Sequence, residues 1–94
     1  MIEKFELGQV VTMRGVAAAC EKDLHFTEEV QQAYLKYIDC DWGETSAEDC
    51  ALNDSAVANN NDRIVAKYIT SKGNILIITE QDRSVTTILF ANEY

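Results

Sequence analysis

The stretch ILIITEQDRSVTTILF, residues 75–90, limits the folds open to this chain more than any other segment. Ile75–Ile78 is a continuous apolar run, too short for a stable helix and typical of a strand that is covered on both faces. Ser84–Phe90 alternates between two faces with the period of two that a pleated strand imposes. Residues 80–83 form a polar connection of a length common in hairpins. The stretch therefore predicts a β-hairpin whose first strand is central in a sheet.

A third strand is expected directly before this hairpin. Arg63–Thr70 alternates between two faces, and residues 71–74, SKGN, form a turn into the central strand. The three strands would form an antiparallel meander. Phe5–Met13, which contains a Val-Val pair, fits either a short strand or the lead-in to a helix, and we favour the strand.

Two helices are predicted in the first half of the chain. Residues 15–20, GVAAAC, favour a short helix with Thr12 as its N-cap. Thr27 is predicted to cap a second helix whose first turn holds Glu28 and Glu29, where the helix dipole favours negative charge. Apolar residues then recur at intervals of three and four as far as the DWG segment at 41–43, which indicates an amphipathic helix packed on the sheet.

A third helix is predicted from Thr45 or Ser46 to the turn-rich Asn59–Asp62 segment, and Ser46 with Asp49 has the spacing of a capping box. On a helical wheel one side gathers Ala47, Cys50, Ala51, Val57 and Ala58. Asp54 falls in the middle of that side, with Asn53 at its edge, and a carboxylate on an apolar stripe is costly unless it has a partner.

The best partners for Asp54 in the sequence are Arg83 and the hydroxyls of Thr86 and Thr87. These contacts would lock the third helix onto the hairpin. The expected fold is therefore α+β, a single domain over residues 1–94 with two to three N-terminal helices packed on a C-terminal three-stranded antiparallel meander, with room for a short N-terminal strand.

The net charge of −8 is concentrated in residues 21–62, which carry eleven carboxylates against two lysines. A negative surface repels phosphates and attracts basic patches, so we expect no direct binding to nucleic acid and, if there is a partner, a basic protein. The simpler alternative is that the charge only keeps the protein soluble.

Three cysteines without a CxxC pair fit reduced thiols in a cytosol, and MIEKFELG lacks the apolar core of a signal peptide. We therefore expect a cytoplasmic protein with no membrane segment. The one histidine, His25, has no visible nucleophile partner with a third orienting residue. Zinc binding by Cys20, His25, Cys40 and Cys50 would match no compact pattern, so we expect no catalytic residues, metal or cofactor.

Three groups remain as binding candidates. Glu80, Asp82 and Arg83 lie in the hairpin turn, where they either organise the loop or bind a ligand. Trp42 is either an interaction hot spot or an anchor in the core. The remaining pair, Glu48 and Asp49, adds to the acidic helical surface formed with Glu28 and Glu29.

The strings GQVVTMRGVA, DWG, LND and ITEQDRSVTTILF, with a terminal EY, resemble a family of short bacterial proteins found on plasmids and other mobile elements. The resemblance spans nearly the whole chain. One departure is Ala91-Asn92 before the final EY, where the family ending has a proline. The resemblance implies a mobile-element setting and no particular activity.

Two hypotheses of different class follow. The first is a non-catalytic interaction protein whose acidic helical surface binds a basic host or element protein. The second is a small enzyme or ligand-binding domain that uses the turn at Glu80–Thr87. The oligomeric state is open between monomer and homodimer, since the outer strands, Arg63–Thr70 and Ser84–Phe90, would have free edges for pairing.

Overall fold

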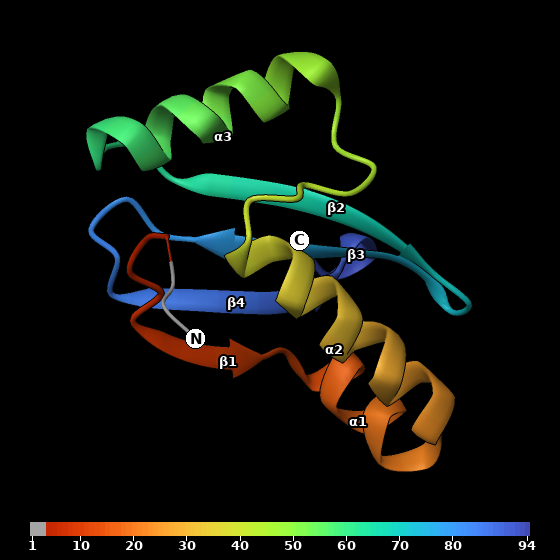
Figure 1. Cartoon of the computed structure of the whole chain (residues 1–94). Helices are drawn as coiled ribbons and strands as arrows, with labels where there is room; N and C mark the ends of the chain where they lie inside the picture. Colours follow the sequence, from red (N-terminus) through yellow and green to blue (C-terminus); the bar gives the residue numbers. More distant parts are fainter. Residues whose placement is uncertain (1–3) are drawn as a thin grey trace.

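The computed structural model describes residues 4–94, so residues 1–3 of the MIEKFELG segment lie outside the described part. The elements follow one another as β1 (Gln9–Thr12), α1 (Arg14–Lys22), α2 (Leu24–Ile38), α3 (Ala47–Asn59), β2 (Ile64–Thr70), β3 (Gly73–Thr79), β4 (Val85–Phe90) and a 3-10 turn η1 (Ala91–Glu93). Figure 1 shows α1 and α2 packed against the sheet, with α3 alongside β2. The predicted α+β class is confirmed.

The sheet has four strands in the order β1-β4-β3-β2, with β2–β3 and β3–β4 antiparallel and β1–β4 parallel. The sheet as a whole is therefore not the predicted three-stranded antiparallel meander. β2, β3 and β4 pair antiparallel as expected, and the short strand favoured within Phe5–Met13 is confirmed as β1, which adds a parallel pair. β3 is interior, as expected, but β4 is interior too and has no free edge. The additional strand, β1, is only four residues long and mostly exposed, so its apolar pattern in the sequence was weak.

Gly8 brings the N-terminal segment against the β3–β4 turn. Its φ of +64° lies in the left-handed region, and any Cβ there would collide with the backbone oxygens of Arg83 and Ser84. Directly after it, Gln9 donates its backbone N–H to the Ser84 oxygen at 3.0 Å, which begins the parallel pairing. This glycine is therefore what allows β1 to join the sheet beside β4.

One face of the sheet, with α1 and α2, encloses the main core. Phe26 and Tyr37 of α2 are fully buried against Ile64, Ile75 and Ile77 of the strands. The rings of Phe5, Tyr37 and Trp42 form an aromatic cluster with centroid separations of 5.5–6.1 Å. Burial of these large apolar side chains is the main force that holds the helices on the sheet.

Two of the three predicted N-caps were wrong. Met13, with no side-chain cap, precedes α1 where Thr12 was expected. Asp23 caps α2 by accepting from the Phe26 N–H at 3.1 Å, so α2 begins earlier than predicted and its first turn has no acidic residue. Thr27 lies inside the helix and donates to the Asp23 oxygen instead. Of the two candidates for the cap of α3, Thr45 and Ser46, the structure has Ser46, which accepts from the backbone N–H of Asp49.

Candidate functional site

Arg83, in the turn between β3 and β4, is buried and donates hydrogen bonds to backbone oxygens. Its side chain is 6% exposed, and its φ is +61°. At 2.6–3.2 Å the guanidinium donates to five backbone oxygens, those of Ala56, Asn61, Asp62, Glu80 and Gln81. Three of them belong to the last turn of α3 and the segment after it, where a cation suits the helix dipole. The Ala56 oxygen also accepts from the backbone N–H groups of Asn60 and Asn61. Arg83 thus joins the end of α3 to the hairpin turn.

Asp82 organises the same turn locally. Its Oδ1 accepts from the Ser84 hydroxyl at 2.6 Å and from the Ser84 N–H at 3.0 Å. The hydroxyl contact, with the backbone contact after it, lowers the pKa of the Asp82 carboxyl below its ordinary value. A shallow polar hollow beside the turn is lined by Asn60, Asn61, Glu80, Gln81, Asp82 and Ser84. The hollow contains polar groups but no histidine or cysteine, which gives no support to a nucleophilic site.

The structure does not pair Asp54 with Arg83. Asp54 is exposed, and its Oδ1 accepts from the indole N–H of Trp42 at 2.9 Å. The buried side of α3 carries Asn53 and Ala56, so the predicted stripe through Ala47, Ala51 and Ala58 was wrong. Alanines fit either face of a helix, so the helical wheel did not fix which side of α3 is buried. The rotation of α3 is set by hydrogen bonds to the neighbouring strand.

These hydrogen bonds go to the backbone groups at the outer edge of β2. Asn53 donates to the Val65 oxygen at 2.9 Å and accepts from the Val65 N–H at 3.2 Å. Further along, the Lys67 N–H donates to the Thr45 hydroxyl, and the Lys67 oxygen accepts from the Glu44 N–H at 2.8 Å. Two successive edge positions are therefore already occupied, so the edge pairing suggested for Arg63–Thr70 is largely blocked.

Thr86 and Thr87 face opposite sides of the sheet. Thr86 is fully buried and takes part in a chain of hydroxyls from Tyr37 to Thr79 to Thr86, which donates to the Leu7 oxygen at 2.7 Å. Burial raises the pKa of the Tyr37 hydroxyl, which stays neutral. Thr87 is half-buried on the other face. Neither threonine bonds to Asp54.

Trp42 is 4% exposed and lies in the aromatic cluster. It is therefore an anchor in the core rather than an exposed interaction hot spot. The next residue, Gly43, has a φ of +61°, and a Cβ there would collide with the ring of Tyr68. The DWG segment can therefore lie flat over β2, where Gly43 forms a parallel bridge with Lys67. It brings Glu44 to the end of α2.

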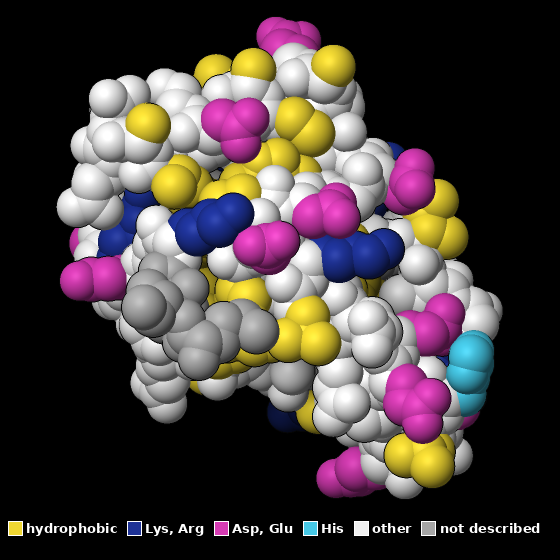
Figure 2. Space-filling view, viewed as in Figure 1, with side chains coloured by type: hydrophobic (Ala, Val, Ile, Leu, Met, Phe, Trp, Pro, Cys, Tyr) yellow, Lys and Arg dark blue, Asp and Glu magenta, His cyan; other side chains and the backbone are white. Residues whose placement is uncertain are grey.

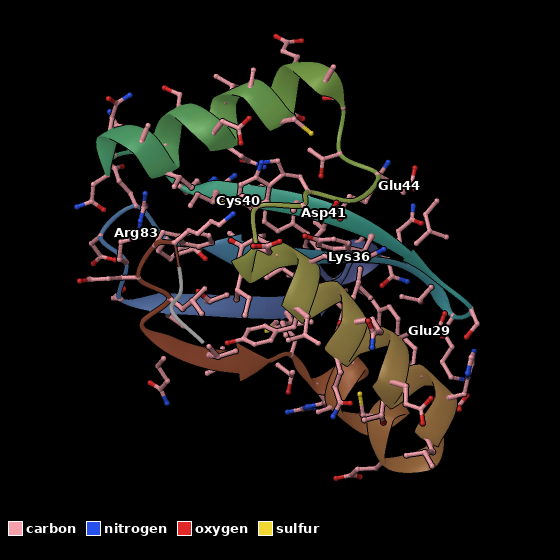
Figure 3. All side chains as sticks on the ribbon, viewed as in Figure 1. Glu29, Lys36, Cys40, Asp41, Glu44 and Arg83 are labelled. Carbon is pink, nitrogen blue, oxygen red and sulfur yellow. The ribbon has the colours of Figure 1, made fainter. Side chains whose placement is uncertain are left out.

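A groove of about 320 Å³ runs between α2 and the end of β2. Its lining comes from α2 (His25, Glu28, Glu29, Gln32, Ala33, Lys36), from the loop (Gly43, Glu44) and from β2 (Tyr68, Ile69). Three carboxylates thus face one lysine and a histidine over apolar contacts. In Figure 3, Glu29, Lys36 and Glu44 lie toward one end of the sheet and Arg83 lies at the other.

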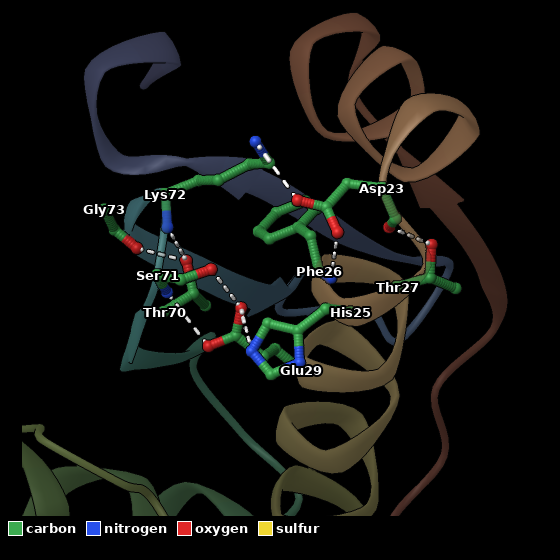
Figure 4. A network of polar contacts seen from close by, with 9 residues as sticks. All are labelled: Asp23, His25, Phe26, Thr27, Glu29, Thr70, Ser71, Lys72 and Gly73. Atoms are coloured by element: carbon green, nitrogen blue, oxygen red, sulfur yellow. Dashed lines mark hydrogen bonds and ion pairs between the residues drawn. The ribbon is translucent and has the colours of Figure 1, made fainter.

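Glu29, at one end of this groove, is hydrogen-bonded within the fold. It accepts from the Ser71 hydroxyl at 2.5 Å and from the Ser71 N–H at 2.9 Å, while Lys72 pairs with Asp23 at 3.3 Å (Figure 4). The Ser71 hydroxyl lowers the pKa of the Glu29 carboxyl below its ordinary value. These contacts hold the β2–β3 hairpin against α2. Within residues 4–94, Glu28 and Glu44 have no such partner.

Ile69 lies at the outer edge of β2 beside this groove, with its side chain on the sheet face opposite α2. It is 65% exposed, and the alternation of an antiparallel ladder points its N–H and carbonyl away from β3, as at Val65 and Lys67. It is the next edge position after those occupied by Asn53 and the Glu44–Thr45 segment. Sequence reasoning missed Glu44 and Ile69, because no pattern along the chain indicates that the end of β2 lies beside α2.

Glu48 and Asp49 lie elsewhere, in the first turn of α3, where negative charge complements the helix dipole. Figure 2 shows acidic side chains spread over the visible face, with Lys and Arg side chains between them, rather than one continuous acidic patch. The expected acidic helical surface is therefore divided. Glu28 and Glu29 line the groove, whereas Glu48 and Asp49 do not.

The cysteines are unpaired and half-buried, and burial raises the pKa of the Cys40 and Cys50 thiols. Over residues 4–94, no three His, Cys, Asp or Glu side chains are arranged to hold a metal ion. None of the described helices has the length and apolar content needed to cross a membrane. Comparison with known proteins found no matching family model, no matching curated sequence and no matching solved structure.

Proposed function

We propose that this protein is a non-catalytic interaction module that binds a basic segment of another protein in the groove between α2 and the end of β2. The single observation that carries the proposal is the composition of that groove. Unpartnered Glu28 and Glu44 border it, Ala33 and Tyr68 add apolar lining, and the outer edge of β2 at Ile69 lies beside it. Cationic side chains with an apolar neighbour suit such a lining.

The same charge pattern favours protein over nucleic acid as the partner. The chain has a net charge of −8, so its overall field repels phosphates and attracts basic proteins. We further propose a cytoplasmic setting on a bacterial mobile element, supported by the sequence resemblance and by the three free thiols. The partner would then be a basic protein of the host or of the element.

The alternative site at Glu80–Thr87 is less well supported. Its cation, Arg83, is buried and bonded to backbone oxygens, and Asp82 is bonded to Ser84. A ligand in the polar hollow beside the turn would meet side chains that already have internal partners. We therefore assign the turn a structural role within this proposal.

A matched pair of double variants tests the groove. Glu28→Gln with Glu44→Gln should weaken binding of a short peptide of alternating lysine and leucine roughly tenfold, because two charge contacts at about 0.7 kcal/mol each are lost. Glu48→Gln with Asp49→Asn removes the same charge from α3 and should change binding less than twofold. Titration by fluorescence anisotropy at low and high salt measures both, and salt should weaken the wild-type complex.

Equal losses in the two double variants would mean that the peptide responds to net charge alone, which would contradict a localised site. Unchanged binding in the groove variant would contradict the proposal as well. Capture from host lysate at low salt, compared between wild type and the groove variant, then identifies the natural basic partner.

A further inference from the structure

Ile69 contributes its main chain, and not its side chain, to the groove between α2 and the end of β2. Successive strand residues face opposite sides of a sheet, and the preceding residue, Tyr68, belongs to the core beneath α2. The Ile69 side chain therefore lies on the other face, although Ile69 lines the groove. What borders the groove at this point is the outer backbone edge of β2.

The other outward positions along this edge are already occupied. In an antiparallel ladder every second residue directs its N–H and carbonyl away from the neighbouring strand, which on β2 applies to residues 65, 67 and 69. The partners before and after Ile69 all come from the chain itself: Asn53 for Val65, Thr45 and Glu44 for Lys67, and Glu29 for the N–H of Ser71. Within residues 4–94 the two outward groups of Ile69 have no such partner.

The loop after α2 shows that this edge accepts a further extended segment. Gly43 forms a parallel bridge with Lys67, and the Glu44 N–H donates to the Lys67 oxygen at 2.8 Å. A tight turn closed by the backbone N–H of Thr45 then carries the loop away from the strand. The row of backbone that the loop begins beside β2 thus stops before it reaches Ile69.

We propose that the basic partner binds in this groove as an extended strand, whose main chain pairs with the N–H and carbonyl of Ile69. The inference rests on the proposed function, because it describes how the partner lies in the same groove. Strand addition at an open edge obtains affinity from main-chain hydrogen bonds and specificity from alternate side chains. A helical partner would offer the edge no backbone groups, since its own are paired internally.

The two sides of the edge call for different side chains in the partner. Side chains of an added strand point alternately to the two faces of the sheet. Toward the groove they meet Glu28 and Glu44, which favour lysine or arginine. On the opposite face they meet the Ile69 side chain, which is 65% exposed and favours an apolar residue. The partner segment is therefore expected to alternate basic and apolar residues.

The open part of the edge is short, because Ile69 is the single outward position between the Glu44 loop and Ser71. It offers one donor and one acceptor to a partner strand. Main-chain pairing therefore adds to the charge contacts of the groove rather than replacing them. A peptide whose backbone is blocked should lose the first contribution and keep the second.

Backbone-methylated peptides test the pairing. Two versions of the alternating lysine-leucine peptide carry methyl groups on the backbone nitrogens of all leucines or of all lysines. In an added strand only one of these alternate sets points toward β2, so one version should bind roughly tenfold more weakly than the unmodified peptide and the other within about twofold. The two versions have the same charge and the same number of methyl groups, so each is the control for the other. Fluorescence anisotropy measures both.

The set that is sensitive also reports the direction of the strand. In an antiparallel pair the residue opposite Ile69 shares its face and exchanges both hydrogen bonds with it, so methylated leucines would weaken binding. In a parallel pair the bonds go to the residues on either side of that position, so methylated lysines would do so. Either result supports strand addition.

Ile69→Pro tests the same contact from the side of the protein. Proline removes an N–H that takes no part in the β2–β3 ladder, a change that an edge position tolerates. Ile69→Ala keeps the N–H and is the matched control. The unmodified peptide should bind Ile69→Pro roughly tenfold more weakly than Ile69→Ala. If circular dichroism shows that Ile69→Pro does not fold, the methylated peptides still decide the question.

Equal binding of the two methylated peptides, whether both are retained or both are weakened, would overturn the strand pairing. Equal binding of the unmodified peptide to folded Ile69→Pro and to Ile69→Ala would do the same. If that peptide still depends on Glu28 and Glu44, the groove remains the binding site and only the strand is wrong. An unmodified peptide that does not bind, or that binds independently of these carboxylates, would overturn both proposals.

Discussion

At the start of β2, the guanidinium of Arg83 donates to five backbone oxygens, whereas at the end of the same strand Glu28 and Glu44 have no partner among residues 4–94. Both regions are rich in charge along the sequence. The difference lies in what the backbone requires, since the segment after α3 and the hairpin turn present carbonyls that accept from Arg83, whereas no such backbone contact is made by the carboxylate of Glu28 or Glu44 in the described part of the chain. Charge used by the backbone stabilises the fold, and charge left over is free to bind.

The largest expected effect that tests this comparison comes from Arg83→Leu. Removing the guanidinium takes away the donor that the Asn61, Asp62 and Gln81 carbonyls share and cuts the tie between the end of α3 and the turn. The free energy of unfolding should therefore fall by about 3 kcal/mol or more. Urea denaturation followed by circular dichroism measures the loss. Arg63→Leu, at an exposed arginine next to β2, is the control and should cost less than about 1 kcal/mol. Similar losses in the two variants would show that Arg83 is not the link between α3 and the turn.

Asn53→Ala should have the next largest effect. It removes both hydrogen bonds to Val65 and leaves edge groups of β2 unpaired, at a cost of about 1–3 kcal/mol. Asn59→Ala, on the exposed part of the same helix, should cost much less. The comparison uses the same denaturation measurement, and amide hydrogen exchange at Val65 should speed up only in Asn53→Ala. Unchanged exchange there would contradict the role assigned to Asn53.

A smaller effect is expected at Glu29, which lines the groove but also bonds to Ser71 of the fold. Its folded pKa lies below the ordinary value of 4.5, so ionised Glu29 stabilises the fold above that pH, and this contribution is lost as pH falls through the folded pKa. The difference in unfolding free energy between wild type and Glu29→Gln should therefore be constant near neutral pH and shrink in acid. Denaturation at a series of pH values measures it. A difference that grows in acid would contradict the assigned sign.

The smallest change in stability is expected in the groove. Glu28→Gln with Glu44→Gln should alter the free energy of unfolding by no more than about 0.5 kcal/mol, because neither carboxylate has an internal partner. The same variant should lose binding to the basic peptide. A large loss of stability would instead assign these carboxylates to the fold, as in the turn around Arg83.

The sequence predicted the strands of the hairpin, the strand before it and the order of the three helices, because their periodicity is strong over several residues. It did not predict that β1 pairs in parallel with β4. The two strands lie at opposite ends of the sequence, and a strand of four residues leaves almost no local pattern. Asp54 and Arg83 were correctly singled out as polar groups in need of partners. Their actual partners, the indole of Trp42 and the carbonyls after α3, depend on the rotation of α3, which alanines do not specify.

The site was harder to predict than the fold. Glu28 and Glu29 were named in the sequence as acidic residues, but the groove also needs Glu44 from the DWG loop and Ile69 from β2. These residues meet only because Gly43 lets the loop lie on Tyr68 and because Ser71 ties the hairpin to Glu29. Both are contacts between distant parts of the chain, which periodicity does not reveal.

The most direct test of the central claim is to map where a basic peptide binds. Titrating the lysine-leucine peptide into isotope-labelled protein and following the backbone amide shifts by NMR reports every region at once. We predict that the largest shifts fall on residues 28–36 of α2, on Glu44 and on Ile69. Shifts centred on the first turn of α3 or on the Glu80–Ser84 turn would contradict the assignment of the groove as the binding site.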